Sequence, residues 1–296
     1  METLRQDIGF ALRTLRNSPG FAFIAVLSLA LGIGANSAIY SVYSALFNRQ
    51  LGVRDVGSLV DIYTSDEFDE YMVSSYPDYV DIRDQSGDVL EGVLTYNMTL
   101  AIQDLGEESR YVFGEEVSGN YFQLLGVEPA LGRLFEETDD IFGAEPTVVL
   151  MHGTWKALYG GDPDVLGQRM KLNGSDFTII GVAPSDFTGM FPFKVDMWIP
   201  IHMREINSPE AEMSQEAASL ESRGSRSLWL KGRLREGITL EQAQATLATI
   251  GERLAEDYPE SNEGRHINAL LTADVAMVPF LDRPVKLFLV FLMAMV

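Results

Sequence analysis

An uncharged stretch of 32 residues, Asn17 to Asn48, constrains this chain more than any other feature of its sequence. A helix needs about 20 apolar residues to cross the hydrocarbon core of a bilayer, so the part from Phe21 to Phe47 is long enough to span. A second apolar run, Leu287 to Val296, follows a long acidic region, and the chain stops inside it. We therefore predict a transmembrane helix at 19–49 and the start of a second one at 284–296, in a fragment or truncated product.

Charge is distributed unevenly along the chain. Residues 50–280 hold 40 of the 43 Asp and Glu but only 16 of the 22 Lys and Arg, which gives that region a net charge of −24. Binding to nucleic acid needs clustered Lys and Arg, so we expect no nucleic-acid partner. The absence of cysteine excludes both disulfides and thiolate chemistry.

The basic residues around the first apolar run predict its orientation. Arg5, Arg13 and Arg16 precede the run and Arg49 and Arg54 follow it, so the positive-inside tendency places the amino terminus in the cytoplasm. Apolar residues recur at helical spacing before the run, which indicates a cytoplasmic amphipathic helix at 1–18. A cleaved signal peptide is the alternative, but secretory apolar regions are about 7 to 15 residues long, and this run is longer.

Small residues recur within the predicted membrane helix. Ala30, Gly34 and Ala38 fall four apart, and Ser28 with Gly32 makes a second pair. Small side chains at this spacing let two helix backbones approach closely in lipid. We interpret these five residues as candidates for helix packing; the alternative is a lone helix that is rich in small residues.

The acidic region alternates between strand and helix patterns, which favours an α+β fold. Strands are predicted at 58–63, 93–102, 111–117, 147–151, 169–172, 177–182, 196–199, 227–234 and 267–271. Helices are predicted at 76–85, 121–125, 154–159 and from Leu240 to Leu254, the last with Thr239 and Gln242 as a capping box. Asn173-Gly174 predicts a hairpin turn, and the polar segment 203–224 predicts a flexible loop.

Signals for catalysis are nearly absent. His152, His202 and His266 are widely separated and lack metal-ligand spacing, and no G-x-S-x-G motif occurs. Residues 32–37 approach a dinucleotide fingerprint but lie inside the membrane helix. No G-x-x-x-x-G-K-[ST] motif occurs, so any ATP-driven step belongs to another chain. We predict that the chain is not an enzyme and holds no cofactor or metal.

A series of short motifs resembles the MacB/FtsX-like ABC transporter permeases. The resemblance begins at 11–21 and 29–38 and continues in order through most of the chain, closest to the duplicated orphan permeases. Its further motifs are at 117–122, 125–127, 131–133, 161–163, 166–167, 172–174, 180–184 and 233–238.

The resemblance implies the organisation of the chain. It implies a MacB-like periplasmic core domain at 50–283, with a membrane-proximal lobe (50–125 plus 222–283) and an inserted lobe (126–221). It also implies further permease helices, a homodimer or internal pseudo-dimer, and a separate ATPase subunit.

The function implied by the resemblance is transmission of a conformational change across the inner membrane, for export or mechanical work. The alternative is an extracytoplasmic sensor or ligand-binding module held between two membrane helices. The region that follows Val296 separates the two hypotheses, because three permease helices favour the first and a signalling domain favours the second.

Overall fold

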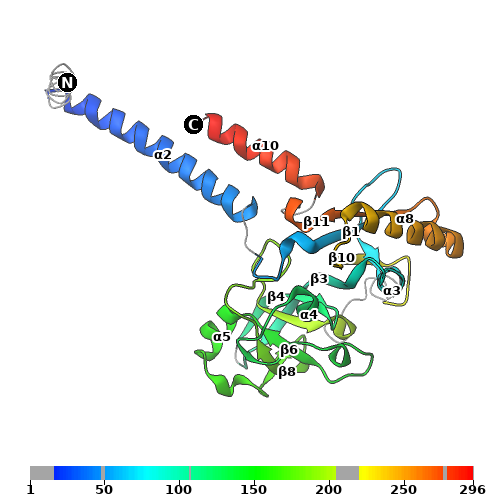
Figure 1. Ribbon diagram of the computed structural model, residues 1–296. Helices are drawn as coiled ribbons and strands as arrows, with labels where there is room; N and C mark the ends of the chain where they lie inside the picture. The colour runs from blue at the N-terminus through cyan, green and yellow to red at the C-terminus, as the bar shows by residue number, and fades with distance from the viewer. Residues whose placement is uncertain (1–16, 48–50, 107, 205–219, 276–278, 296) are drawn as a thin grey trace. The chain divides into compact units, whose positions relative to one another are not determined.

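The computed structural model describes residues 17–47, 51–106, 108–204, 220–275 and 279–295 (Figure 1). It divides into two compact units, one formed by 50–279 and the other by the segments before and after. The predicted amphipathic helix at 1–18 lies almost wholly outside the described residues, and so does most of the predicted loop at 203–224.

The first apolar run is one continuous helix, α2, from Pro19 to Phe47. Within the described residues it is the one helix that is long and apolar enough to cross a membrane, over Pro19–Ser44. The second apolar run belongs to α10, Pro279–Met295, whose apolar part is the shorter segment Pro284–Met293. The described part of this helix includes residues 279–283, ahead of the predicted start of the membrane segment at 284.

The domain formed by 50–279 alternates strands and helices. Its strands are β1 Leu59–Ser65, β2 Ser74–Ser75, β3 Leu90–Asp104, β4 Ser109–Val117, β5 Leu131–Gly132, β6 Thr147–Leu150, β7 Arg169–Leu172, β8 Ser175–Val182, β9 Met197–Pro200, β10 Arg226–Leu234 and β11 His266–Leu271. Its helices are α3 Tyr76–Gln85, α4 Tyr121–Leu125, α5 His152–Tyr159, α8 Leu240–Asp257 and α9 Pro259–Asn262. The predicted α+β class is confirmed.

The strands join in the order β11-β1-β10-β3-β4-β9-β6-β8-β5, and β7 pairs with both β3 and β8. Because of this double pairing, β3, β4, β9, β6, β8 and β7 close on themselves as a small barrel. Its interior is filled by apolar side chains from all six strands, such as Val112, Leu172 and Phe177. The barrel draws β3 and β4 from the predicted membrane-proximal lobe and its other strands from the predicted inserted lobe; the division into lobes stays a prediction.

An antiparallel extension of the barrel, β11-β1-β10-β3, is covered on one face by α3 and α8 (Figure 1). Helix α8 begins where the sequence predicts, since Thr239 and Gln242 form the reciprocal capping box. Its buried face consists of Ala243, Leu247, Ile250, Gly251 and Leu254. Glycine at 251 suits a close approach, because a Cβ there would lie 3.1 Å from the backbone nitrogen of Ile267 on β11, tighter than most Cβ contacts.

Two details within residues 126–221 can be compared with the sequence predictions, and one agrees while the other does not. Asn173 and Gly174 both have positive φ, 47° and 86°, as the predicted hairpin turn between β7 and β8 requires. The segment 126–146, for which the sequence predicts neither a strand nor a helix, contains β5, which pairs with β8. So short a strand, with Gly132 at its end, has no alternating pattern for sequence reasoning to detect.

An aromatic core packs on the outer face of the barrel and contains a buried carboxylate. Glu115 of β4 accepts hydrogen bonds from the Tyr121 hydroxyl (2.5 Å), the Trp198 indole nitrogen (2.8 Å) and the backbone nitrogens of Met190 (2.7 Å) and Phe191 (3.0 Å). Burial raises the pKa of Glu115, and these four donors act in the opposite direction. The carboxylate is therefore held by neutral donors.

The next residue, Glu116, points to the other face of β4 and is held differently. Its Oε2 accepts from Nε of Arg204 at 2.7 Å, and both side chains are at least nine-tenths buried. Burial raises the pKa of Glu116 and the charge of Arg204 opposes that rise. Nη1 of Arg204 also donates to Ser227 Oγ on β10, so this ion pair connects the barrel with the neighbouring strand.

Candidate functional site

The two ends of the 50–279 domain meet at adjacent strands. β1 is the first strand of the domain and β11 the last, and they pair antiparallel over six residues, from Val60↔Leu271 to Ser65↔His266. β10 pairs with the other edge of β1. The segment that follows α2 and the segment that leads to α10 are therefore tied to one small part of the sheet.

A buried ion pair links these strands. Asp61 of β1 lies directly opposite Lys231 of β10, and the Lys231 ammonium donates to Asp61 Oδ1. Nζ of Lys231 also lies 3.4 Å from Oγ1 of Thr272, the residue that follows β11. Both charged side chains are at most 6% exposed. One lysine therefore connects β1, β10 and the exit from β11.

Arg233, two residues further along β10, holds the segment that enters β1. Its Nη1 donates to the carbonyl of Asp55 (3.1 Å) and to Ser58 Oγ (2.6 Å), and its Nη2 donates to the carbonyl of Arg54 (2.8 Å). Its Nε donates to the carbonyl of Leu124 in α4 at 2.8 Å. The guanidinium thereby joins the entering segment, β10 and the aromatic core.

Burial of Arg233 and the nearby charge of Arg54 lower its pKa. None of the four hydrogen bonds found for it in the described part of the chain ends on a carboxylate, so the cation is balanced mainly by carbonyl dipoles. A buried cation that donates hydrogen bonds to carbonyls of several segments holds those segments together. We call Arg54–Ser58, Asp61, Lys231, Arg233 and Thr272 the junction.

Two hollows border these elements. One, of about 460 Å³, is lined by junction residues and by residues 234–238 after β10. The other, of about 360 Å³, lies beside α3, where Tyr76 and His202 line it and burial raises the pKa of Tyr76 to about 12. In this second hollow Arg83 is paired with Asp84 and the Asp140 carboxylate with His202. Charges in both hollows are paired within the chain. The junction is the stronger candidate site because it connects the first and last strands of the domain.

The histidines belong to three separate elements. His152 begins α5, His202 contacts Asp140 at 2.9 Å, and His266 begins β11. Within the described ranges no group of three or more His, Asp or Glu side chains is arranged to hold a metal ion. The predictions of no catalysis and no cofactor stay predictions.

The predicted packing residues all lie on α2. Ala30, Gly34 and Ala38 are exposed along one face, and Ser28 is exposed as well, whereas Gly32 is half-buried. At 100° per residue, Gly32 lies on the opposite side of the helix from Ala30, Gly34 and Ala38. The half-buried residues that share the side of Gly32 include Ala25, Asn36 and Ile39. The packing role of the five residues stays a prediction.

Sequence reasoning did not identify the junction. A signal was available, because Asp61 stands between Val60 and Ile62 in an apolar strand and Lys231 and Arg233 alternate with apolar residues in another. Charges at these positions are almost never fully buried without a partner. No local pattern predicts that Asp61 pairs with Lys231, because the two residues are far apart along the chain.

The chain is similar to a known domain family and to several solved structures. The model of the MacB-like periplasmic core domain matches residues 22–250. Among solved structures, the periplasmic region of MacB from Actinobacillus actinomycetemcomitans is 16% identical with a TM-score of 0.52, covering 79% of this chain and 94% of that one. A domain of a permease protein from Porphyromonas gingivalis is 17% identical with a TM-score of 0.54, covering 74% and 91%. No curated protein matches the chain.

Proposed function

Because the chain belongs to the family of the MacB-like periplasmic core domain, we propose that its 50–279 domain transmits conformational change across the inner membrane within an ABC-type permease. The general role as the extracytoplasmic part of such a permease follows from membership and from the fold. The direction and mechanism of transmission are the proposal. The single observation that supports them is the pairing of β1 with β11.

The physical argument is one of stiffness. If α2 and the helix after β11 move relative to each other, the displacement acts on two strands that are hydrogen-bonded over six residue pairs. The Lys231 and Arg233 contacts then carry it to β10, and β10 pairs with β3 of the barrel. A sheet tied in this way moves as a body, because packed cores resist continuous deformation.

The partners and orientation belong to the same proposal. We expect a separate ATPase subunit, further permease helices and a second copy or homologous half. The amino terminus lies in the cytoplasm and the 50–279 domain outside. A reporter fused after Gly264 should be active only in the exported compartment; activity in the cytoplasm reverses this orientation.

Helix packing in the membrane is a separate test. If Ala30, Gly34 and Ala38 pack against another helix, Gly34→Leu should weaken cross-linking between helices.

Transmission can be tested by spin-label distances. The chain has no cysteine, so Tyr40→Cys on α2 and Phe142→Cys in the 50–279 domain, at side chains that are 59% and 87% exposed, can carry two labels that report movement of the domain relative to the helix. In the permease assembled with its ATPase in membranes, a non-hydrolysable ATP analogue should shift the distance distribution. Arg233→Met should reduce that shift by more than half, since it releases the entering segment from β10.

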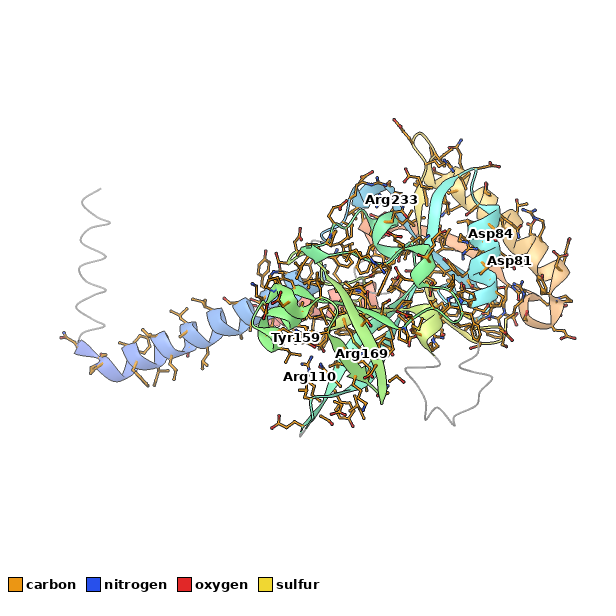
Figure 2. All side chains as sticks on the ribbon, turned by 90° about the horizontal axis from the view of Figure 1, so that it is seen from below. Asp81, Asp84, Arg110, Tyr159, Arg169 and Arg233 are labelled. Carbon is orange, nitrogen blue, oxygen red and sulfur yellow. The ribbon has the colours of Figure 1, made fainter. Side chains whose placement is uncertain are left out.

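Controls separate coupling from folding. Arg169→Met removes a guanidinium whose side chain is 72% exposed on β7, distant from Arg233 in Figure 2, and should leave the shift unchanged. Ser58→Ala removes one bond and keeps the Arg233 cation, so it should give a partial loss even if Arg233→Met does not fold. An unchanged distance distribution in the wild-type assembly on nucleotide binding overturns the proposal.

A further inference from the structure

The hairpin formed by β3 and β4 exposes a row of large apolar side chains. Leu100 lies opposite Phe113 and Ile102 opposite Tyr111, and Met98 precedes them on the same face of β3. The exposed fractions of these five side chains lie between 44% and 68%. We call these five residues the hairpin face; Leu105 in the turn, 48% exposed, extends it.

The other face of the same strands is already buried. Ala101 of β3 and Val112 of β4 point into the barrel interior and are at most 1% exposed. Side chains that are apolar on both faces are typical of strands covered on both sides. On the outer face the cover ends beyond Tyr96, which is 5% exposed in the aromatic core, and Met98 is the next residue on that face. The hairpin face thus has the composition of a buried surface without a cover from the described chain.

The charges around the hairpin face are paired within the chain. Lys171 of β7 lies 3.8 Å from Asp104, and Arg169 lies 3.4 Å from Asp176. Behind the strands, Arg110 lies 3.3 Å from Asp196. Figure 2 shows Arg110, Tyr159 and Arg169 together in one part of the domain, away from Arg233.

The remaining charges near the hairpin face change this balance little. By sequence, Glu107 and Glu108 between the two strands contribute two negative charges and Lys194, two residues before Asp196, contributes one positive charge, a net of −1. The surroundings are therefore close to neutral, although residues 50–280 carry a net charge of −24. Two such domains repel each other over most of their surfaces and least where the hairpin faces meet. An anionic bilayer surface would meet the same general repulsion.

The size of the hairpin face agrees with an interface between copies. Together with Leu105 it exposes roughly 600 Å² of apolar side chain, taking about 200 Å² for each fully exposed residue. Two copies in face-to-face contact would bury about 1,200 Å², the lower end of the range for specific interfaces. Anchoring in one membrane raises the effective concentration of the copies, so a modest affinity suffices.

We propose that the hairpin face packs against the hairpin face of a second copy of this chain across a two-fold axis. Such a contact is isologous, so each copy contributes the same residues. The proposal rests on the proposed function for the presence of a second copy in the same membrane, and it adds the surface through which the two copies meet.

Cysteine cross-linking tests the contact in the full chain. Single cysteines are introduced at each of the five hairpin-face positions, and membranes containing the chain are oxidised. Disulfides form only where the Cα atoms of the two residues approach within about 7 Å, so positions near the axis should give covalent dimers. Phe68→Cys and Phe142→Cys are more exposed than any hairpin-face residue and serve as matched controls that should give few dimers.

A charge substitution provides the second arm. Leu100→Lys places like charges on both sides of the axis and should reduce cross-linking at Ile102→Cys at least tenfold. Phe68→Lys should not reduce it, and thermal unfolding monitors the fold of each variant. The proposal is overturned if none of the five positions yields dimers, or if they cross-link only to a different protein in native membranes. Neither result affects the nucleotide-dependent distance change, so the two proposals fail independently.

Discussion

The two ends of the β3–β4 hairpin differ in the burial of their outer face, which is covered at the base and exposed at the tip. At the base, the outer face of the hairpin carries Tyr96 and Glu115 beneath the aromatic core, and every polar atom of Glu115 is matched by a donor. Toward the tip, the same face carries Leu100 and Phe113, which are about half exposed. The polar groups at the base are therefore satisfied within the chain, whereas the apolar side chains at the tip are left exposed by the described residues, and we propose that a second copy covers them.

Glu115→Ala should give the largest effect that separates the two ends. The substitution leaves four buried donors without an acceptor and opens a cavity, so we expect a loss of about 5 kcal/mol in the free energy of unfolding. Urea unfolding followed by tryptophan fluorescence measures it. Glu108→Ala, the matched removal of a carboxylate at the tip, should change stability by less than about 0.5 kcal/mol. Similar losses for the two variants would remove the distinction between base and tip.

Arg204→Met should have the next largest effect and sharpen the description of the base. It leaves the Glu116 carboxylate buried without its cation, at a cost of about 4 kcal/mol near neutral pH. The pKa of Glu116 is already raised in the folded state, and loss of Arg204 raises it further.

The sign of the pH dependence of Arg204→Met follows from that shift. An acid whose folded pKa is raised binds its proton more tightly in the folded state, so the folded state is favoured below the ordinary value of 4.5 and this advantage is lost as pH rises through the folded pKa. The cost of Arg204→Met should therefore be small in acid and grow with pH. A cost that is constant across this range contradicts the interpretation.

One substitution made at both ends of β3 gives the smallest and most closely matched difference. Leu94 and Leu100 lie on the same face of β3, but Leu94 is 0% exposed in the aromatic core and Leu100 is 51% exposed. Leu94→Ala should cost about 3 kcal/mol, whereas Leu100→Ala should change the stability of the monomeric chain by less than about 0.5 kcal/mol. Thermal unfolding of both variants in detergent measures the difference, and equal shifts would mean that the tip is covered within the chain.

Local patterns were sufficient to predict much of the fold. The 29-residue helix α2 follows from an uncharged run, and the start of α8 follows from Thr239 and Gln242, because a cap is made by residues three apart. The turn at Asn173-Gly174 was equally local. The closure of the barrel was not predictable in this way. It depends on β7 pairing with β3, which involves only Gln103 and Asp104 at the end of a long strand.

The candidate site was less accessible to sequence reasoning than the fold. The predicted packing residues of α2 follow from a spacing rule, and nothing in the structure tests them. The junction consists of contacts between residues far apart in sequence, such as Arg233 with Asp55, and these contacts leave no periodic signal. Charged residues within apolar strands mark where such contacts occur but not with which partner.

The sequence by itself determined which segments are apolar enough for a membrane, which alternate as strands, and which family the motifs resemble. These properties depend on composition and on neighbours along the chain, because hydrophobic transfer and helix capping are local. Only the tertiary structure decided that β1 and β11 lie side by side, that Glu115 is held by four neutral donors while Glu116 is held by Arg204, and that the hairpin face has no cover from the described residues. Burial and pairing depend on the whole fold, since the free energy of a charge or an apolar side chain is set by what surrounds it in space.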